Sequence, residues 1–82
     1  MSNLARTPQQ IGALIRRNRK QLGLSQSALG ERVGLRQETI SLIETGNPAT
    51  RLDTLLAVLA ALDLELQIAA RTRQHDVADL IE

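Results

Sequence analysis

The chain contains no cysteine, phenylalanine, tryptophan or tyrosine, and only one histidine among its 82 residues. Without cysteine it cannot form a disulfide, a thiol nucleophile or a cysteine-ligated zinc site, and a single histidine cannot form a histidine cluster. We therefore expect neither a metal nor any other cofactor. Without aromatic side chains the chain lacks the stacking platforms that hold single-stranded nucleic acids. Among nucleic acids, duplex DNA is therefore favoured over RNA as a partner.

Long hydrophobic runs are also lacking. The longest nearly apolar run, residues 52–64, is too short to span a bilayer and contains Asp53 and Asp63. The N-terminus has no apolar stretch of the kind that signal peptides carry. We therefore expect a cytoplasmic protein with no membrane partner. A chain of this length is expected to form one domain with a modest core, which a partner subunit would help to stabilise.

The net charge of +1 conceals an uneven distribution of charged residues. Residues 1–41 carry seven Lys and Arg against two Asp and Glu, a balance of +5, whereas residues 42–82 carry three against seven, a balance of −4. A basic N-terminal half fits a surface that faces phosphates, and an acidic C-terminal half is better suited to a protein partner. Solvated helix faces are the alternative explanation of this asymmetry.

Residues 25–46, SQSALGERVGLRQETISLIETG, are the most informative stretch of the sequence. Ser25 can cap a first helix, and Gly34 can end it in the left-handed conformation. A second helix follows almost at once, with Ile40 and Ile43 facing inward and Leu35 supporting them from the turn. Its opposite face is polar and comprises Gln37, Glu38, Ser41 and Thr45. Two short helices around such a turn are typical of chains that place a helix in the DNA major groove.

Two further helices flank this unit. Thr7, Pro8 and Gln10 predict a capping box that opens a helix ending at Gly23. Its predicted inner face is Ile11, Leu14, Ile15 and Leu22, and its predicted outer face is Arg16, Arg17, Arg19 and Lys20. After a loop at residues 47–48, Thr50 and Asp53 predict the start of a last helix. The apolar positions of that helix are Leu52, Leu55, Leu56, Leu59 and Leu62.

Residues 64–71, LELQIAAR, alternate between apolar and polar residues for most of their length, which favours a β-strand. No other segment could pair with it in the same chain, so its backbone groups would stay unpaired. Pairing with the same segment of a second copy would satisfy them and bury Leu64, Leu66 and Ile68. A short fifth helix is the alternative. The predicted organisation is an N-terminal arm (1–7), a helix-turn-helix domain (8–63), a dimerising strand (64–71) and an acidic tail (72–82).

Residues 8–64 resemble the Xre/Cro-type helix-turn-helix family, which includes lambdoid phage repressors. The segment LGLSQSALGERVGLRQETISLIETG matches that family's pattern at many positions in register. The resemblance implies an all-α, lambda-repressor-like fold of four to five helices. It also implies that Gln26 touches backbone phosphate, and that the recognition helix presents its side chains to the bases. The implied base-facing residues are Arg36, Gln37, Glu38 and Ser41.

The resemblance implies one ion pair, and the chain differs from the family's pattern at three positions. The family keeps a basic and an acidic residue at the positions of Arg19 and Glu44, which implies an ion pair between them. Gly30 stands where alanine is usual, and either residue is small enough for close helix packing. Arg36 stands where serine often caps the recognition helix, so a cation replaces a cap. Leu42 stands where a basic or polar residue is common, and it either packs partly on the domain or contacts a thymine methyl.

The C-terminal part narrows the resemblance to HipB-type antitoxins, which dimerise through such a strand and partner a HipA-type kinase toxin. In the tail, Val77, Leu80 and Ile81 have helical spacing and are predicted to bind the toxin. A frayed terminus is the alternative. The sequence gives little support for an enzyme. His75 and Asp76 lie in a polar tail, and no nucleophile motif surrounds Ser25, Ser27 or Ser41.

We interpret the chain as a homodimeric, sequence-specific repressor of double-stranded operator DNA, and as the antitoxin and autoregulator of a HipBA-like operon. A free-standing phage-type repressor, and a module that mainly neutralises a toxin, are the alternatives. The predicted DNA-binding residues are Arg17, Arg19, Ser25, Gln26, Arg36, Gln37, Glu38, Thr39, Ser41, Thr45 and Asn47. The predicted dimer interface comprises Leu62, Leu64, Leu66 and Ile68.

Overall fold

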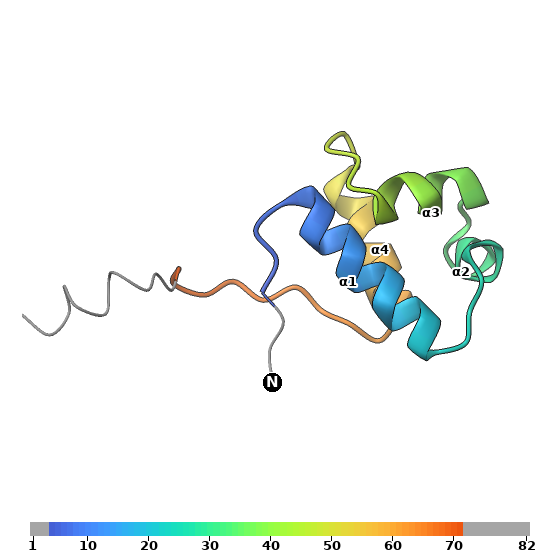
Figure 1. The fold of residues 1–82 in the computed structure, drawn as a ribbon, viewed down its shortest axis with the longest axis horizontal. Helices are drawn as coiled ribbons and strands as arrows, with labels where there is room; N and C mark the ends of the chain where they lie inside the picture. Colours follow the sequence, from blue (N-terminus) through green and yellow to red (C-terminus); the bar gives the residue numbers. More distant parts are fainter. Residues whose placement is uncertain (1–3, 72–82) are drawn as a thin grey trace, which may run out of the picture.

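The computed structural model describes residues 4–71, so the predicted toxin-binding residues Val77, Leu80 and Ile81 lie outside the described residues. Within this range the chain forms four helices: α1 (Pro8–Gln21), α2 (Gln26–Val33), α3 (Gln37–Glu44) and α4 (Leu52–Ala61). Figure 1 shows α1 crossing in front of α4, with α2 and α3 at one end and an extended segment leaving the domain after α4. The predicted all-α helix-turn-helix fold is confirmed.

Side-chain caps fix the beginnings of α1 and α2. The Thr7 hydroxyl accepts a hydrogen bond from the Gln10 backbone N–H at 3.1 Å, and Pro8 occupies the first turn. Gln10 accepts in return from the backbone N–H of Arg6 at 2.6 Å, one residue before the partner that a regular capping box uses. The Ser25 hydroxyl accepts from the Ala28 N–H at 3.0 Å. The predicted starts of both helices are therefore confirmed.

Thr50 does not cap α4, so the predicted start of this helix is wrong. The Thr50 hydroxyl donates to the carbonyl of Asn47 at 3.0 Å, and α4 begins at Leu52 with Arg51 as a cap that makes no side-chain hydrogen bond. Asp53 accepts from the side chain of Arg51 and from the backbone N–H of Thr54, and both interactions hold the pKa of Asp53 below its usual value. Thr50 lies one residue before the N-cap position, so its hydroxyl bonds to the loop and not to the first turn of α4.

The core collects apolar side chains from all four helices. Its buried members are Ile15, Leu29, Ile40, Ile43, Val58, Leu59 and Leu62. The predicted apolar face of α4 is wrong at three positions, because Leu52 and Leu56 are 62% and 43% exposed while Val58, which was not assigned to that face, is completely buried. On α1, the predicted inward residue Leu22 is likewise 53% exposed. Leu62, predicted at a dimer interface, is instead a member of this core.

The backbone of α1 passes directly against the end of α3. Gly12 is buried, and a Cβ atom added to it would meet the carbonyl oxygens of Ile43 and Glu44, the latter at 2.5 Å. Both are backbone atoms, which cannot rotate away as a flexible side chain can. The close approach of α1 to α3 therefore depends on the missing side chain.

We expect Gly12→Ala to destabilise the domain. Overpacking costs about 1–3 kcal/mol, which exceeds the gain of about 1 kcal/mol in helix propensity. Urea unfolding followed by circular dichroism measures the difference. Ala13→Gly, at the exposed neighbouring position of α1, measures the propensity term alone. A more stable Gly12→Ala variant would show that α1 and α3 have room to separate.

The segment after α4 adopts no regular structure in the single chain. Leu62 ends α4, Asp63 has a φ of 60°, and the Leu64 N–H donates to the Leu59 carbonyl at 2.8 Å. Leu64 packs against the core, whereas Leu66 is 48% and Ile68 is 96% exposed. Residues 64–71 form neither a helix nor a strand. The strand paired with a second copy therefore stays a prediction.

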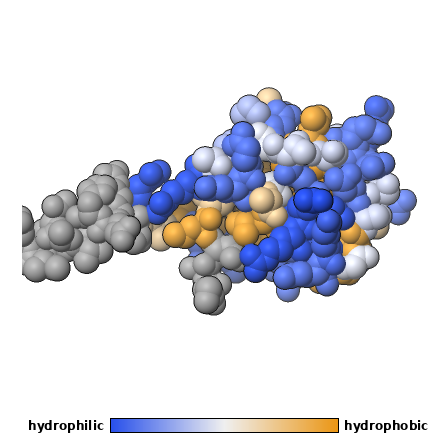
Figure 2. All heavy atoms as spheres, viewed as in Figure 1, coloured by the Kyte–Doolittle hydropathy of each residue, from blue (hydrophilic) through white to orange (hydrophobic). Residues whose placement is uncertain are grey.

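Figure 2 shows hydrophobic side chains gathered along this segment where it leaves the body of the domain. Among the four helices of residues 4–71, none combines the length and the apolar character needed to cross a membrane.

Candidate nucleic-acid interface

Helices α2 and α3 and the turn between them form the core of the candidate site. Gly34 ends α2 with a φ of 73°, and Leu35 turns inward, where its N–H donates to the Gly30 carbonyl at 2.8 Å. A Cβ atom at Gly30 would lie 2.5 Å from the Leu35 carbonyl oxygen, so this position serves close packing at the turn. The expectation that alanine would fit here as well as glycine is therefore wrong, because an alanine Cβ would need the Leu35 backbone to shift.

Helix α3 buries one face and leaves the opposite face at the surface. Ile40 and Ile43 are in the core, as predicted, while Gln37, Glu38 and Thr45 are exposed. Figure 1 places α3 at the edge of the molecule, with no other helix over its outer side. Leu42 is 53% exposed. The polar face is thus exposed at the first turn and at the C-cap of α3, whereas Ser41 between them is partly buried.

The first turn of α3 combines a cation with free backbone donors. Arg36 is the N-cap residue and is exposed, and its side chain makes no capping hydrogen bond. The first backbone N–H groups of a helix have no partner within the helix and carry a partial positive charge. Arg36 and Gln37 therefore stand where an electronegative partner is favoured.

A buried ion pair ties α3 to α1. The Arg19 Nε atom lies 2.6 Å from Glu44 Oε2, and Arg19 Nη2 donates to Glu44 Oε1 at 3.1 Å. The two side chains are only 8% and 2% exposed. Arg19 also donates to the carbonyl of Leu24 at 2.7 Å, in the connection between α1 and α2. The predicted Arg19–Glu44 pair is confirmed.

Burial of this pair also corrects the prediction that Arg19 contacts DNA from the outer face of α1. Arg19 follows Ile15 by four residues, so it lies on the inward side of the helix, and its guanidinium is engaged by Glu44 and Leu24. The hydrogen bond to Glu44 raises the pKa of Arg19, while burial opposes that change. Arg19 is thus a charged structural residue, and no buried side-chain nitrogen or oxygen among residues 4–71 lacks a partner.

Two glutamine side chains continue from this ion pair to the surface. Gln26, at the start of α2, donates through Nε2 to Glu44 Oε1 at 3.1 Å. Gln37, at the start of α3, donates through Nε2 to Gln26 Oε1 at 3.3 Å. We call the chain Arg19, Glu44, Gln26 and Gln37 the polar relay. The family resemblance implied the pair of Arg19 and Glu44, but the sequence contained no signal that Gln26 and Gln37 would join it, because these partners are 18 and 11 positions apart.

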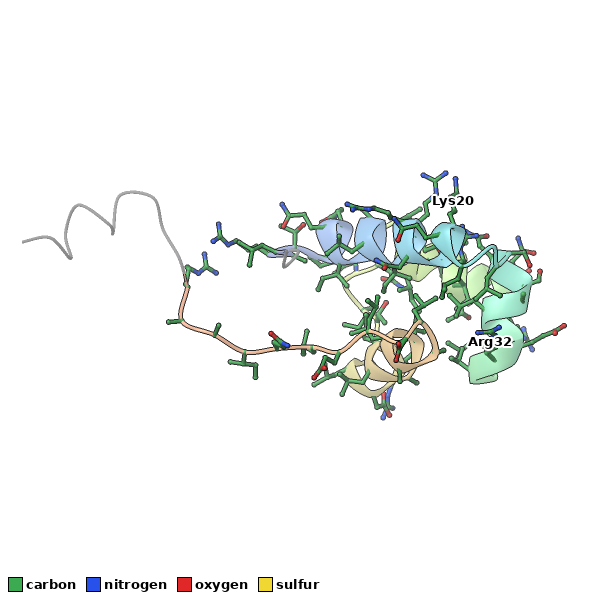
Figure 3. The ribbon with its side chains drawn as sticks, turned by 90° about the horizontal axis from the view of Figure 1, so that it is seen from below. Lys20 and Arg32 are labelled. Carbon is green, nitrogen blue, oxygen red and sulfur yellow. The ribbon has the colours of Figure 1, made fainter. Side chains whose placement is uncertain are left out.

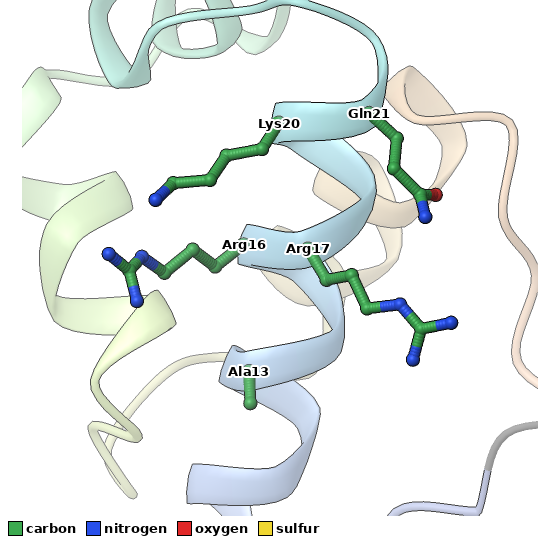
Figure 4. A pocket seen from close by; sticks show the side chains of 5 residues that line it. All are labelled: Ala13, Arg16, Arg17, Lys20 and Gln21. Atoms are coloured by element: carbon green, nitrogen blue, oxygen red, sulfur yellow. The ribbon is translucent and has the colours of Figure 1, made fainter.

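The exposed cations of α1 form a separate basic surface. Arg16, Arg17 and Lys20 are all exposed, together with Gln21 and Ala13 along an open groove. Figure 4 shows Arg16 and Lys20 extending to one side of α1, and Arg17 and Gln21 to the other. In Figure 3, Lys20 on α1 is well separated from Arg32 on α2. The predicted site included Arg17 but omitted Arg16 and Lys20.

The remaining predicted DNA-binding residues lie at the start of α2, on α3 or in the loop that follows α3. Ser25 is exposed, and Thr39, Ser41 and Asn47 are partly buried. The Thr45 hydroxyl donates to the carbonyls of Ser41 and Leu42 within its own helix. Asn47 accepts from the Ala49 N–H at 3.1 Å and so shapes the loop after α3. Among residues 4–71, no three His, Cys, Asp or Glu side chains are grouped as a metal ion would require.

The chain is similar to known helix-turn-helix proteins in both sequence and structure. A family described as helix-turn-helix matches residues 15–68, which is more than half of the chain. The solved HipA–HipB–O2–O3 complex and HipB–O4 20mer complex each match with a TM-score of 0.79 and 28% identity, over 87% of this chain and 100% of theirs. A HipB variant in a complex with an O2 20mer matches with a TM-score of 0.79 and 29% identity, over 88% of this chain and 100% of its own. No curated protein matches.

Proposed function

The chain belongs to the Xre/Cro-type helix-turn-helix family and has a HipB-like fold, and we propose that it is a sequence-specific repressor that binds double-stranded operator DNA. We further propose that it is the antitoxin and autoregulator of a HipBA-like toxin–antitoxin operon. The observation that carries the DNA-binding proposal is the exposed polar surface at the first turn of α3, where Arg36 and Gln37 lie. A buried ion pair between Arg19 and Glu44 holds the other end of α3 to α1.

Helix α3 has the dimensions and chemistry of a recognition helix. The major groove admits one α-helix, and the N-terminal residues of that helix reach the base edges. Arg36 can donate to guanine, and Gln37 can both donate and accept, as adenine requires. We propose that Gln26 and Ser25, at the start of α2, approach the phosphates beside the groove.

The basic surface of α1 supports the same proposal in a different way. Arg16, Arg17 and Lys20 are exposed cations, and none of them forms an ion pair within residues 4–71. Cations near DNA attract the phosphate backbone regardless of sequence and release counterions when they bind. We propose that Arg17 contributes in this way.

Replacing Gln37 by alanine tests the base-reading role. We expect Gln37→Ala to weaken binding to the preferred duplex by about 1–3 kcal/mol and to change binding to random duplex little, because only a base-reading contact distinguishes the two. The preferred duplex is first obtained by selection from a randomised pool with the wild-type protein. Affinities are then measured by fluorescence anisotropy at fixed salt.

Arg17→Ala is the matched control for that measurement. It should weaken binding to both duplexes alike and reduce the dependence of binding on salt, since it removes a charge and no base contact. If Gln37→Ala instead weakens both duplexes equally, Gln37 does not read a base.

The proposal also includes a toxin partner and a homodimer. The HipB protein that this fold matches is found in a solved complex with HipA, which supports a HipA-type kinase as the protein partner. We propose that Leu64, Leu66 and Ile68 join two copies, and that Val77, Leu80 and Ile81 contact the toxin. Affinity capture of the native protein followed by mass spectrometry tests the partner, and recovery of no kinase would favour a free-standing repressor.

A further inference from the structure

We propose that Glu44 is a positioning residue for base recognition, because its carboxylate fixes which way the side-chain amides of Gln26 and Gln37 point. The inference rests on the proposed reading of a base by Gln37. It assigns a specificity role to a residue that is almost completely buried and cannot itself reach DNA.

The ion pair of Arg19 and Glu44 joins a group of donors to a group of acceptors. A guanidinium has only donors and an ionised carboxylate has only acceptors. Glu44 receives hydrogen bonds from Arg19 on both of its oxygens, at 2.6 and 3.1 Å. Any further partner of this carboxylate must therefore present a donor.

Gln26 is that partner. Its Nε2 atom lies 3.1 Å from Glu44 Oε1, in a partly buried position. An end-for-end flip of this amide would place two oxygens against each other, with both groups acting as acceptors. Glu44 thus holds the amide nitrogen of Gln26 inward, and the Oε1 atom of Gln26 faces the other way.

Gln26 in turn orients the side-chain amide of Gln37. The outward Oε1 atom of Gln26 can only accept, and it lies 3.3 Å from the Nε2 atom of Gln37. With its nitrogen anchored there, Gln37 retains one N–H and its carbonyl oxygen for other partners. An acceptor beside a donor complements the N6 amino group and N7 atom of adenine, whereas guanine presents two acceptors at these places.

The consequence is a preference that depends on the relay. An anchored Gln37 favours A·T over G·C at its base pair, because the O6 atom of guanine would face the Gln37 carbonyl. An amide that is free to flip can offer its NH₂ group to guanine as well. Breaking the relay should therefore lower discrimination at one base pair, even though Gln37 remains in place.

The experiment compares affinities for two duplexes that differ only at the base pair read by Gln37, which is the position where Gln37→Ala loses discrimination. We expect the wild-type full-length chain to prefer A·T by about ten-fold or more. Glu44→Gln and Gln26→Met should each reduce the preference to about two-fold or less. Gln26→Met keeps the Arg19–Glu44 pair and so separates the relay from the stability of the fold. Ser27→Ala, an exposed neighbour on α2 outside the relay, should keep the wild-type preference.

A double variant tests whether Gln26 acts only through Gln37. With Gln37 already replaced by alanine, Gln26→Met should change the A·T preference no further, because the relay acts only through Gln37. If Gln26 also binds a phosphate, its replacement lowers both affinities equally and leaves their ratio unchanged.

The outcomes separate this inference from the proposed function. If Gln37→Ala abolishes the A·T preference while Glu44→Gln and Gln26→Met retain it, the proposed role of Glu44 is wrong, and the proposal that Gln37 reads a base is kept. If the wild-type chain binds all duplexes equally, base reading fails and the inference fails with it. In the DNA-free protein, NMR should show Gln26 side-chain amide protons that are shifted and exchange slowly, and Glu44→Gln should abolish both features. Unchanged signals in Glu44→Gln would also overturn the relay.

Discussion

Glu44→Ala is expected to lower the free energy of unfolding by about 3–5 kcal/mol, the usual cost of removing one partner from a buried ion pair. Arg19 would keep its charge in a site where its side chain is 8% exposed, with no carboxylate to balance it. Small domains are stable by about 5–15 kcal/mol in total. The variant should therefore lose much of its stability, and helices α1 and α3 should lose their fixed angle.

Urea unfolding of single and double variants measures this effect. Arg19→Met removes the charge but keeps most of the buried volume, so the double variant Arg19→Met with Glu44→Ala should be more stable than the sum of the single effects implies. Arg51 and Asp53 provide the control, because their side chains are 80% and 69% exposed. Asp53→Ala should leave the unfolding midpoint nearly unchanged, since solvent screens an exposed pair. Additive single effects at Arg19 and Glu44 would show that the pair is not coupled.

The pH dependence of the pair follows from the direction of the pKa change. The pKa of Arg19 is raised by its hydrogen bond to Glu44. A pKa that is raised in the folded state stabilises the fold fully below the ordinary arginine value, and this stabilisation is lost as the pH rises from that value through the raised one. The contribution of Arg19 should therefore stay constant across the neutral range.

Local signals explain why the helix-turn-helix unit could be predicted. Ser25 and Gly34 act through their own backbone neighbours, so their caps are visible in the sequence and appear in the structure. Ile40 and Ile43 alternate with polar residues at helical spacing, which identifies the buried face of α3. These features depend on few distant contacts.

Other features depended on packing that the sequence does not encode locally. Helix α4 is apolar on nearly all sides, so periodicity could not tell that Val58 is buried and Leu52 exposed. A charged residue such as Arg19 favours a surface position, although its spacing from Ile15 places it inward. The relay between Gln26 and Gln37 requires the angle between α2 and α3, which only the folded chain supplies.

The predicted dimer gives the other large effect. Residues 64–71 leave the domain as an extended segment, with Ile68 96% exposed and Leu66 48% exposed. Exposed apolar side chains beside unpaired backbone groups favour pairing with the same segment of a second copy. Two joined recognition helices would then meet half-sites about one helical turn apart on one face of the DNA.

We expect Leu66→Asp and Ile68→Pro each to give monomers and to weaken operator binding by about 10²–10⁴-fold, because one half-site lacks the joint affinity of two. The aspartate places a charge on the apolar face of the strand, and the proline removes a backbone donor. Gln67→Asp is the matched control, since it places the same charge on the opposite face and should keep the dimer. Analytical ultracentrifugation measures the association state, and anisotropy with one and two half-sites measures the affinity. Intact dimers in both variants would refute the strand interface and direct attention to Leu52 and Leu56, the exposed side of α4.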